Sequence, residues 1–206
     1  MIRYIICCLL AVVAFLPCVA QTEQPIQSNM KTELPYYEIP EAPDSYNAGN
    51  VLARIIDGLG FRYYWATEGL RPEDLAYKPS VEARTTDETL DHVLGLTEVI
   101  ANAINGKINE RPLPESTLTF EEKRKQTLEF IKLASDLLKS SHDGDMDNYK
   151  VVFKRGDNTS ESPFWNLLNG PIDDALWHVG QVVTFRRSSG NPLNPKVSVF
   201  SGKLRE

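Results

Sequence analysis

The sequence has little cysteine and no cluster of basic residues. Its three cysteines, Cys7, Cys8 and Cys18, all fall within the first 20 of 206 residues. Residues 21–206 therefore contain no thiol, which excludes disulfides, a cysteine nucleophile and a cysteine-ligated structural zinc from that part of the chain. The formal net charge is −6, and Lys and Arg are scattered. We therefore expect no nucleic-acid partner, because binding to nucleic acid depends on clustered positive charge.

Long apolar runs are also scarce, and the one present lies at the N-terminus. Residues 5–15 are almost all apolar, Arg3 precedes them, and small residues lead up to Ala20. This pattern predicts a signal peptide over residues 1–20, with cleavage near Ala20 and export to the periplasm or the extracellular space. The run is shorter than the roughly 20 residues that span a bilayer, so we expect no stable membrane span in the mature chain. A lipoprotein anchored at Cys18 is the alternative, which bulky residues upstream disfavour.

The rest of the chain divides into an arm and a domain. Residues 21–43 are polar and rich in Pro and Glu, which predicts an extended arm or linker. Tyr36, Tyr37 and Ile39 are expected to dock on the domain, because bare linkers rarely carry such side chains. Residues 44–206 are long enough for one domain with a sizeable core.

Amphipathic patterns predict the secondary structure of this domain. Four segments have apolar residues at helical spacing: residues 45–67, 86–105, 119–141 and 171–187. Residues 149–154 are short and β-branched, which indicates an extended connection, and residues 164–168 indicate a helical turn. Because strand signals are few, we expect an all-α fold, a four-helix bundle with an N-terminal extended arm.

Several residues define the expected ends and core faces of these helices. Asp44 or Ser45 is expected to cap the first helix, Gly106 to end the second, and Pro171 to begin the fourth. Arg186 is expected to interact favourably with the helix dipole in the last turn. The apolar stripe of the first helix is expected in the core and comprises Val51, Leu52, Ile55, Ile56, Leu59 and Tyr63.

Two helices carry a candidate metal site. Asp174 and His178 are four residues apart, so on a helix both side chains lie on one face, one turn apart. His92 lies on the apolar side of the second predicted helix and is a candidate third ligand. Two imidazoles and one carboxylate form a known facial ligand set that leaves positions open for water or substrate. The alternative is that the pair is an ion pair and His92 a hydrogen-bonded core residue.

Three sequence segments resemble the DinB-like superfamily of four-helix metalloproteins. Residues 170–181, Gly-Pro-Ile-Asp-Asp-Ala-Leu-Trp-His-Val-Gly-Gln, resemble its closing motif, His-x-x-x-His-Arg-Gly-Gln. Residues 83–92, Ala-Arg-Thr-Thr-Asp-Glu-Thr-Leu-Asp-His, resemble the stretch that ends in the family's other histidine. Residues 67–75, Thr-Glu-Gly-Leu-Arg-Pro-Glu-Asp-Leu, resemble the turn after its first helix. The resemblance covers most of residues 48–192.

The resemblance implies a ligand set for this chain. His92 and His178 match two of the family's three histidine ligands, whereas Asp174 stands at the third position and Val179 stands where Arg is common. Carboxylate oxygen still binds zinc, nickel, iron or manganese, and it shifts preference towards harder metals. Gln181, one turn after the site, has two interpretations: it orients a ligand or substrate, or it packs between helices.

The implied functions fall into two classes. Relatives in the superfamily include thiol-dependent transferases and isomerases and metal-dependent hydrolases, so the resemblance implies a metal-dependent hydrolase or transferase with an unknown small-molecule substrate. Thiol cofactors of that kind are cytosolic, which argues against direct transfer of the thiol chemistry to an exported chain. The alternative is a non-catalytic binding or scaffold bundle of the cell envelope that has lost metal. A homodimer is one alternative for the oligomeric state.

Overall fold

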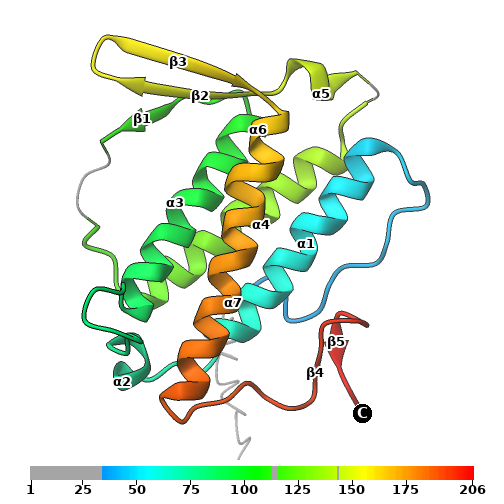
Figure 1. Ribbon diagram of the computed structural model, residues 1–206. Coiled ribbons are helices and arrows are strands. Elements are labelled where there is room, and N and C mark those ends of the chain that lie inside the picture. Colours follow the sequence, from blue (N-terminus) through cyan, green and yellow to red (C-terminus); the bar gives the residue numbers. More distant parts are fainter. Residues whose placement is uncertain (1–33, 113–115, 143) are drawn as a thin grey trace, which may run out of the picture. The chain divides into compact units, whose positions relative to one another are not determined.

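Four long helices dominate the computed structural model, which describes residues 34–112, 116–142 and 144–206. They are α1 (Ala48–Thr67), α3 (Thr86–Ile104), α4 (Phe120–Lys139) and α7 (Asp173–Ser188). Helix α4 packs against α1 and α3, and α7 packs against the same two helices (Figure 1). In the described part of the chain, no helix has both the length and the apolar composition to cross a membrane. The predicted signal peptide lies outside the described residues.

Short elements connect and extend these helices. They are α2 (Pro72–Leu75), β1 (Asn109–Arg111), α5 (Asp145–Asn148), β2 (Lys150–Arg155), β3 (Asn158–Pro163), α6 (Trp165–Leu167), the π-helical turn η1 (Leu168–Ile172), β4 (Val197–Ser198) and β5 (Lys203–Leu204). Strand β2 pairs in antiparallel register with β3 and in parallel register with β1, and β4 pairs with β5. The fold is therefore largely helical, but it includes strands that the expected all-α class does not.

Local sequence signals explain two of the helix starts and correct a third. Helices α3 and α4 each begin after a threonine, Thr85 or Thr119, whose hydroxyl accepts the backbone N–H three residues later. Helix α1 begins at Ala48, three residues later than predicted, with Asn47 as its cap. The Asn47 Oδ1 accepts the backbone N–H of Asn50 at 2.8 Å, whereas Ser45 accepts the side-chain amide of Asn50 and stays outside the helix.

The core forms where the apolar faces of the four long helices meet. Its largest fully buried side chains are Tyr63, Phe61, Ile56, Leu59, Leu90, Ile100, Leu128, Ile131, Leu138, Leu167, Ile172 and Val93. From the predicted stripe of α1, Leu52, Ile56, Leu59 and Tyr63 are buried. The remaining two residues of that stripe, Val51 and Ile55, are 44% and 45% exposed, which corrects the prediction that they lie in the core.

The described end of the arm docks on the domain as the sequence predicts. The Tyr36 side chain is buried, and its hydroxyl donates to the Asp57 carboxylate at 3.0 Å. Lys139 pairs with the other oxygen of Asp57 at 2.8 Å, so this buried charge is compensated. A Cβ atom at Gly60 would lie 2.5 Å from the Tyr36 ring. The close approach of the arm therefore requires glycine at this point of α1.

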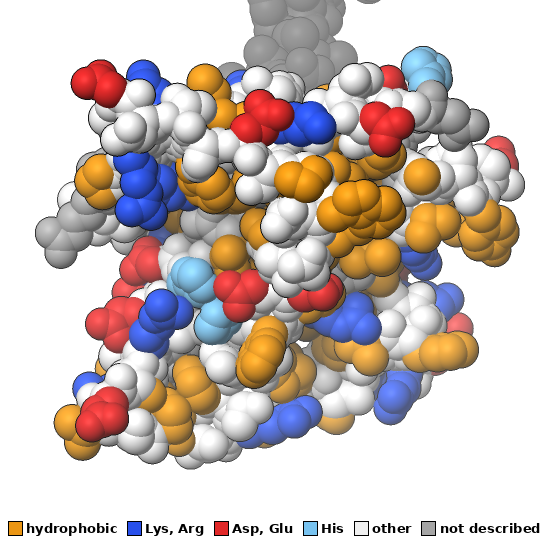
Figure 2. All heavy atoms as spheres, turned by 45° about the horizontal axis from the view of Figure 1, so that its top comes forward, with side chains coloured by type: hydrophobic (Ala, Val, Ile, Leu, Met, Phe, Trp, Pro, Cys, Tyr) orange, Lys and Arg blue, Asp and Glu red, His pale blue; other side chains and the backbone are white. Residues whose placement is uncertain are grey.

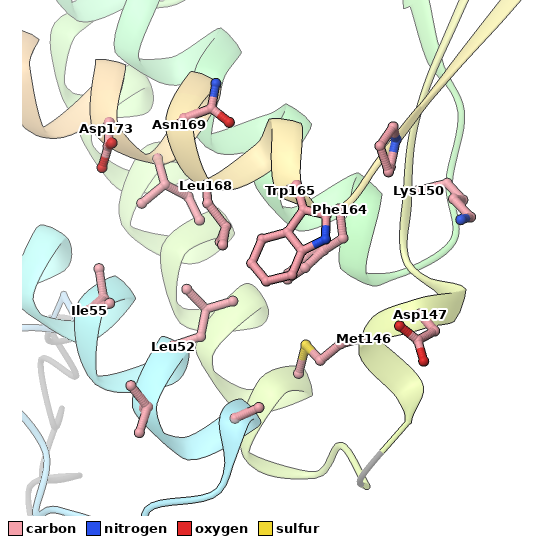
Figure 3. A pocket seen from close by; sticks show the side chains of 14 residues that line it. Leu52, Ile55, Met146, Asp147, Lys150, Phe164, Trp165, Leu168, Asn169 and Asp173 are labelled. Atoms are coloured by element: carbon pink, nitrogen blue, oxygen red, sulfur yellow. The ribbon is translucent and has the colours of Figure 1, made fainter.

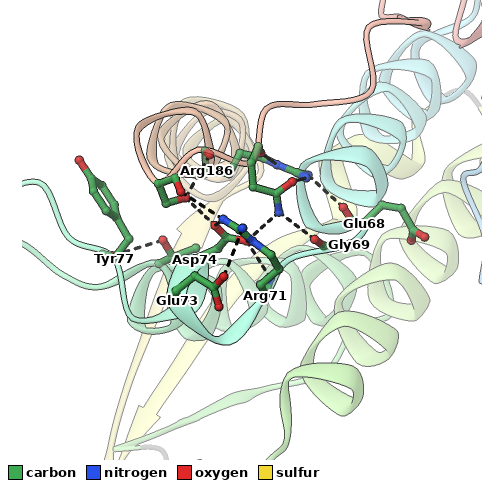
Figure 4. A network of polar contacts seen from close by, with 10 residues as sticks. Glu68, Gly69, Arg71, Glu73, Asp74, Tyr77 and Arg186 are labelled. Carbon is green, nitrogen blue, oxygen red and sulfur yellow. Dashed lines mark hydrogen bonds and ion pairs between the residues drawn. The ribbon is translucent and has the colours of Figure 1, made fainter.

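A polar network holds the C-terminal end of α7 against the end of α1 (Figure 4). Arg186 is buried, and its Nη1 donates to the carbonyls of Trp65, Ala66 and Glu68 at 3.0–3.1 Å. Its Nε donates to the carbonyl of Asn191 at 2.7 Å. These carbonyls belong to helix ends and loops and lack helical partners. Arg186 therefore joins the end of α1 to the loop after α7. The prediction that it interacts with the helix dipole did not include this role.

Candidate metal centre

Helix α3 places His92 toward α7. The helix begins with a capping box in which the Thr85 hydroxyl accepts the N–H of Glu88 at 3.1 Å and the Glu88 carboxylate accepts the N–H of Thr85 at 2.7 Å. His92 lies almost two turns further along and is partly exposed. Its neighbour Val93 is fully buried, which fixes the rotation of the helix around its axis and thereby the direction of His92.

A widened helical turn precedes the two ligands of α7. The helical path begins at Trp165, so Pro171 lies inside the π-helical turn Leu168–Ile172 and does not begin the helix as predicted. Proline has no N–H to donate to the residue four positions earlier, and a π turn accommodates this loss. Asp174 follows on the first turn of α7, and Val179, 2% exposed, faces the core. The neighbouring Asp174–His178 pair therefore faces α3.

The structure brings together the three predicted ligands His92, Asp174 and His178. The Nε2 atom of His92 lies 3.2 Å from Oδ2 of Asp174, and the Nε2 atom of His178 lies 3.2 Å from Oδ1. One ligand atom from each of the three residues lies within 4.8 Å of the other two. The two imidazole rings are edge to face, with centroids 4.6 Å apart. Each carboxylate oxygen therefore faces a different imidazole.

The cluster lies at the surface and is partly open to solvent. The exposed fractions of the side chains are 33% for His92, 40% for Asp174 and 15% for His178. Figure 2 shows two adjacent histidine side chains at the surface, next to acidic side chains and beside an apolar patch. The third histidine, His142, is exposed in a loop and is not part of the cluster.

Gln181 fixes the orientation of His178. Its Oε1 lies 2.7 Å from the Nδ1 of His178. Because an amide oxygen only accepts, Nδ1 carries the hydrogen, and the lone pair of a neutral ring is then on Nε2, facing Asp174. This is the tautomer that metal-binding histidines adopt when their second nitrogen is hydrogen-bonded. Gln181 therefore contacts and orients a candidate ligand, His178.

Electrostatics favour a cation between these groups. Burial lowers the pKa of His92 below its ordinary value, although the hydrogen bond to Asp174 opposes this shift. A neutral His92 offers a lone pair, and the Nε2 atoms of both imidazoles lie 3.2 Å from an oxygen of the Asp174 carboxylate. A divalent cation among these atoms satisfies all three donors. The donor set of two nitrogens and a carboxylate therefore fits zinc, nickel, iron or manganese.

Two other polar residues of α7, Asp173 and Arg186, lie outside the cluster. Asp173 is exposed and does not join the cluster, because residues five apart project from different sides of a helix. Arg186, two turns beyond His178, holds the far end of the same helix in place. Its buried network was missed because its acceptors are backbone carbonyls, which leave no residue-type signal in the sequence.

Comparisons with known proteins identify the fold. No protein-family model matches the sequence, and no curated protein matches it. The structure is similar to the crystal structure of a DinB-like protein, YjoA, from Bacillus subtilis, with 15% sequence identity and a TM-score of 0.50. The similarity covers 73% of this chain and 99% of the other chain. At this identity the similarity establishes the fold alone.

Proposed function

Because the chain has the DinB-like fold, we propose that it is an exported metalloprotein in which His92, Asp174 and His178 bind one divalent cation. The cation is zinc, nickel, iron or manganese, all of which accept imidazole nitrogen and carboxylate oxygen. The proposed activity is that of a metal-dependent hydrolase or transferase acting on a small molecule. The observation that carries this proposal is the convergence of three ligands from two helices.

The chain's own residues prepare the site for such chemistry. A divalent ion held by His92, Asp174 and His178 would supply Lewis acidity and would lower the pKa of bound water. Gln181 holds His178 in the ligand tautomer, and α3 holds His92 opposite it. Three protein ligands leave coordination positions free for water and substrate. The partial exposure of Asp174 and His92 gives a substrate access to those positions.

Export is part of the proposal and is supported by composition. Residues 1–20 have the charge, apolar run and small residues of a signal peptide. Residues 21–206 contain no cysteine, so their folding does not depend on the redox state of the compartment. We propose that the mature protein is periplasmic or extracellular.

A specific observation favours a second candidate function, a non-catalytic scaffold bundle of the cell envelope. The two separations of 3.2 Å between the Asp174 oxygens and the imidazole nitrogens are also hydrogen-bond distances. With one imidazole protonated, the three side chains satisfy one another without a metal. The two candidates therefore differ in metal content.

Elemental analysis by plasma mass spectrometry distinguishes them. We would purify the 21–206 chain without a histidine tag, after incubation with zinc, nickel, manganese or iron, beside H178A. The matched control is H142A, because His142 is exposed and outside the cluster. The proposal predicts about one metal ion per chain in the parent and in H142A and none in H178A. Absence of metal from the parent, or equal metal in H178A, would favour the scaffold.

A further inference from the structure

A cavity of about 620 Å³ lies on the α1 side of the segment that leads into α7. Its walls come from the first half of α1, from α5, and from the α6–η1 segment (Figure 3). Small-molecule sites typically have volumes of about 300–1,000 Å³. None of the three candidate metal ligands lines this cavity, so it is a separate feature of the surface.

The walls of the cavity are apolar and unusually exposed. Val51 and Ile55 of α1, which the helical pattern predicts to be in the core, line the cavity with 44% and 45% exposure. Across from them, Leu168 and Trp165 line it, and Trp165 is 75% exposed. A cluster of exposed apolar side chains around a hollow costs solvation free energy in the empty protein and marks binding surfaces.

The π-helical turn accounts for this arrangement. It contributes Leu168, Asn169 and Ile172 to the lining of the cavity, and the α-helix that follows places Asp174 against His92 of α3. Turns of this kind occur inside helices frequently at functional sites. One irregular turn therefore lines the cavity and precedes the two candidate metal ligands of α7.

Charged side chains are distributed unequally along the cavity. Lys150 is the one cation among the lining residues, and Figure 3 shows it at the same end as Asp147. Asp173 and the neutral Asn169 lie at the other end. In the described part of the chain, neither Lys150 nor the two carboxylates form an ion pair with another residue. The charges of Lys150 and Asp147 thus balance at one end of the cavity, whereas no lining cation balances the Asp173 carboxylate at the other end.

We propose that this cavity binds an amphiphilic organic cation, a small molecule with an apolar body and one ammonium group. The body packs between the aliphatic residues of α1 and the indole of Trp165. The ammonium group faces the Asp173 carboxylate, away from Lys150. An anionic amphiphile would place its charge near Lys150, where Asp147 opposes it. The proposal concerns a site beside the metal cluster and does not require a bound metal.

Isothermal titration calorimetry with three probes of equal chain length tests this proposal. Octyltrimethylammonium, octanoate and octanol would be titrated into the 21–206 chain. We expect the ammonium probe to bind tighter than octanoate, by up to about fivefold, the upper end of the range for a partly exposed charge pair. The substitution D173N should remove this preference. The matched control is D157N, because Asp157 is exposed in the β2–β3 turn and does not line the cavity; it should preserve the preference.

A second variant tests the apolar walls and the competing occupant. W165A should weaken binding of all three probes without unfolding the chain, because the Trp165 side chain is 75% exposed. Tighter binding of octanoate, an unchanged preference in D173N, or no binding of any probe would overturn the proposal. If light scattering shows a dimer that W165A converts to a monomer, and no probe binds, a second copy of the chain covers this cavity and the proposal is wrong. Metal content, measured in the same variants, reports separately on the cluster.

Discussion

Replacing Arg186 by methionine should destabilise the protein strongly, because the guanidinium group is buried and donates to carbonyls at the end of α1 and in the loop after α7. Arg186 is 4% exposed and donates to the carbonyls of Trp65, Ala66, Glu68 and Asn191. Methionine keeps much of the aliphatic volume and removes every donor. The substitution therefore isolates the polar network from the packing.

The expected loss follows from the acceptors left unpaired. A hydrogen bond from a charged donor contributes about 1.5–3 kcal/mol, and an unsatisfied buried acceptor costs about 1–3 kcal/mol. The four acceptors share one donor group and relax partly toward water, so their costs do not add. We expect the free energy of unfolding of R186M to fall by about 3–5 kcal/mol, the range for breaking a buried charged network.

Urea unfolding followed by circular dichroism measures this loss. The matched control is R187M, because Arg187 is adjacent and exposed, and a surface substitution of this kind changes stability by about 0.5 kcal/mol or less. A loss of less than about 1 kcal/mol in R186M, within the range of one ordinary hydrogen bond, would refute the reasoning that Arg186 holds the ends of α1 and α7 together.

Three further predictions concern other parts of the structure. Hydrogen bonds from Arg71 hold the pKa of Asp74 well below its usual range. The stabilisation that Asp74 contributes should therefore be fully present above the unfolded-state pKa of about 4 and should be lost as the pH falls below it. Urea unfolding of D74N at a series of pH values should lack this contribution. G60A should displace the Tyr36 ring, because its Cβ would lie 2.5 Å away, and the tyrosine fluorescence and thermal midpoint should both change. Q181L should weaken zinc binding about 10- to 100-fold in a competition titration, because it removes the group that orients a ligand; an unchanged affinity would contradict that role.

The sequence predicts the helices where local signals are unambiguous. The threonine before each of α3 and α4 caps its helix, and Gly106, with φ of +66°, follows the end of α3 as expected. At α1 the predicted cap, Asp44 or Ser45, is wrong. Asn47 caps the helix because its Oδ1 accepts the backbone N–H of Asn50, whereas Ser45 accepts the side-chain amide of Asn50. Residues 149–154 were predicted to be extended, and they largely coincide with β2. The pairing of β2 with β1 was not predicted, because β1 has three residues, lies about 40 residues away and leaves no periodic signal.

The sequence predicted the residues of the candidate metal site, but it did not predict the cavity beside them. The spacing of Asp174 and His178 places them on one face, and the resemblance selects His92 as their partner. Periodicity could not show that Val51 and Ile55 face a cavity, because both continue the apolar stripe of α1. Residues of the π-helical turn line the same cavity, and a five-residue departure from regular helix geometry has no reliable sequence pattern.

Nuclear magnetic resonance of the histidine rings tests the central claim most directly. The chain has three histidines, His92, His142 and His178, so a long-range proton–nitrogen spectrum of the ¹⁵N-labelled 21–206 chain resolves each ring, with H142A assigning one of them. On addition of zinc, the account predicts that the Nε2 resonances of His92 and His178 shift while those of His142 stay unchanged, and that Nδ1 of His178 carries its hydrogen. Unshifted Nε2 resonances of His92 and His178 under saturating zinc would contradict the proposed metal centre.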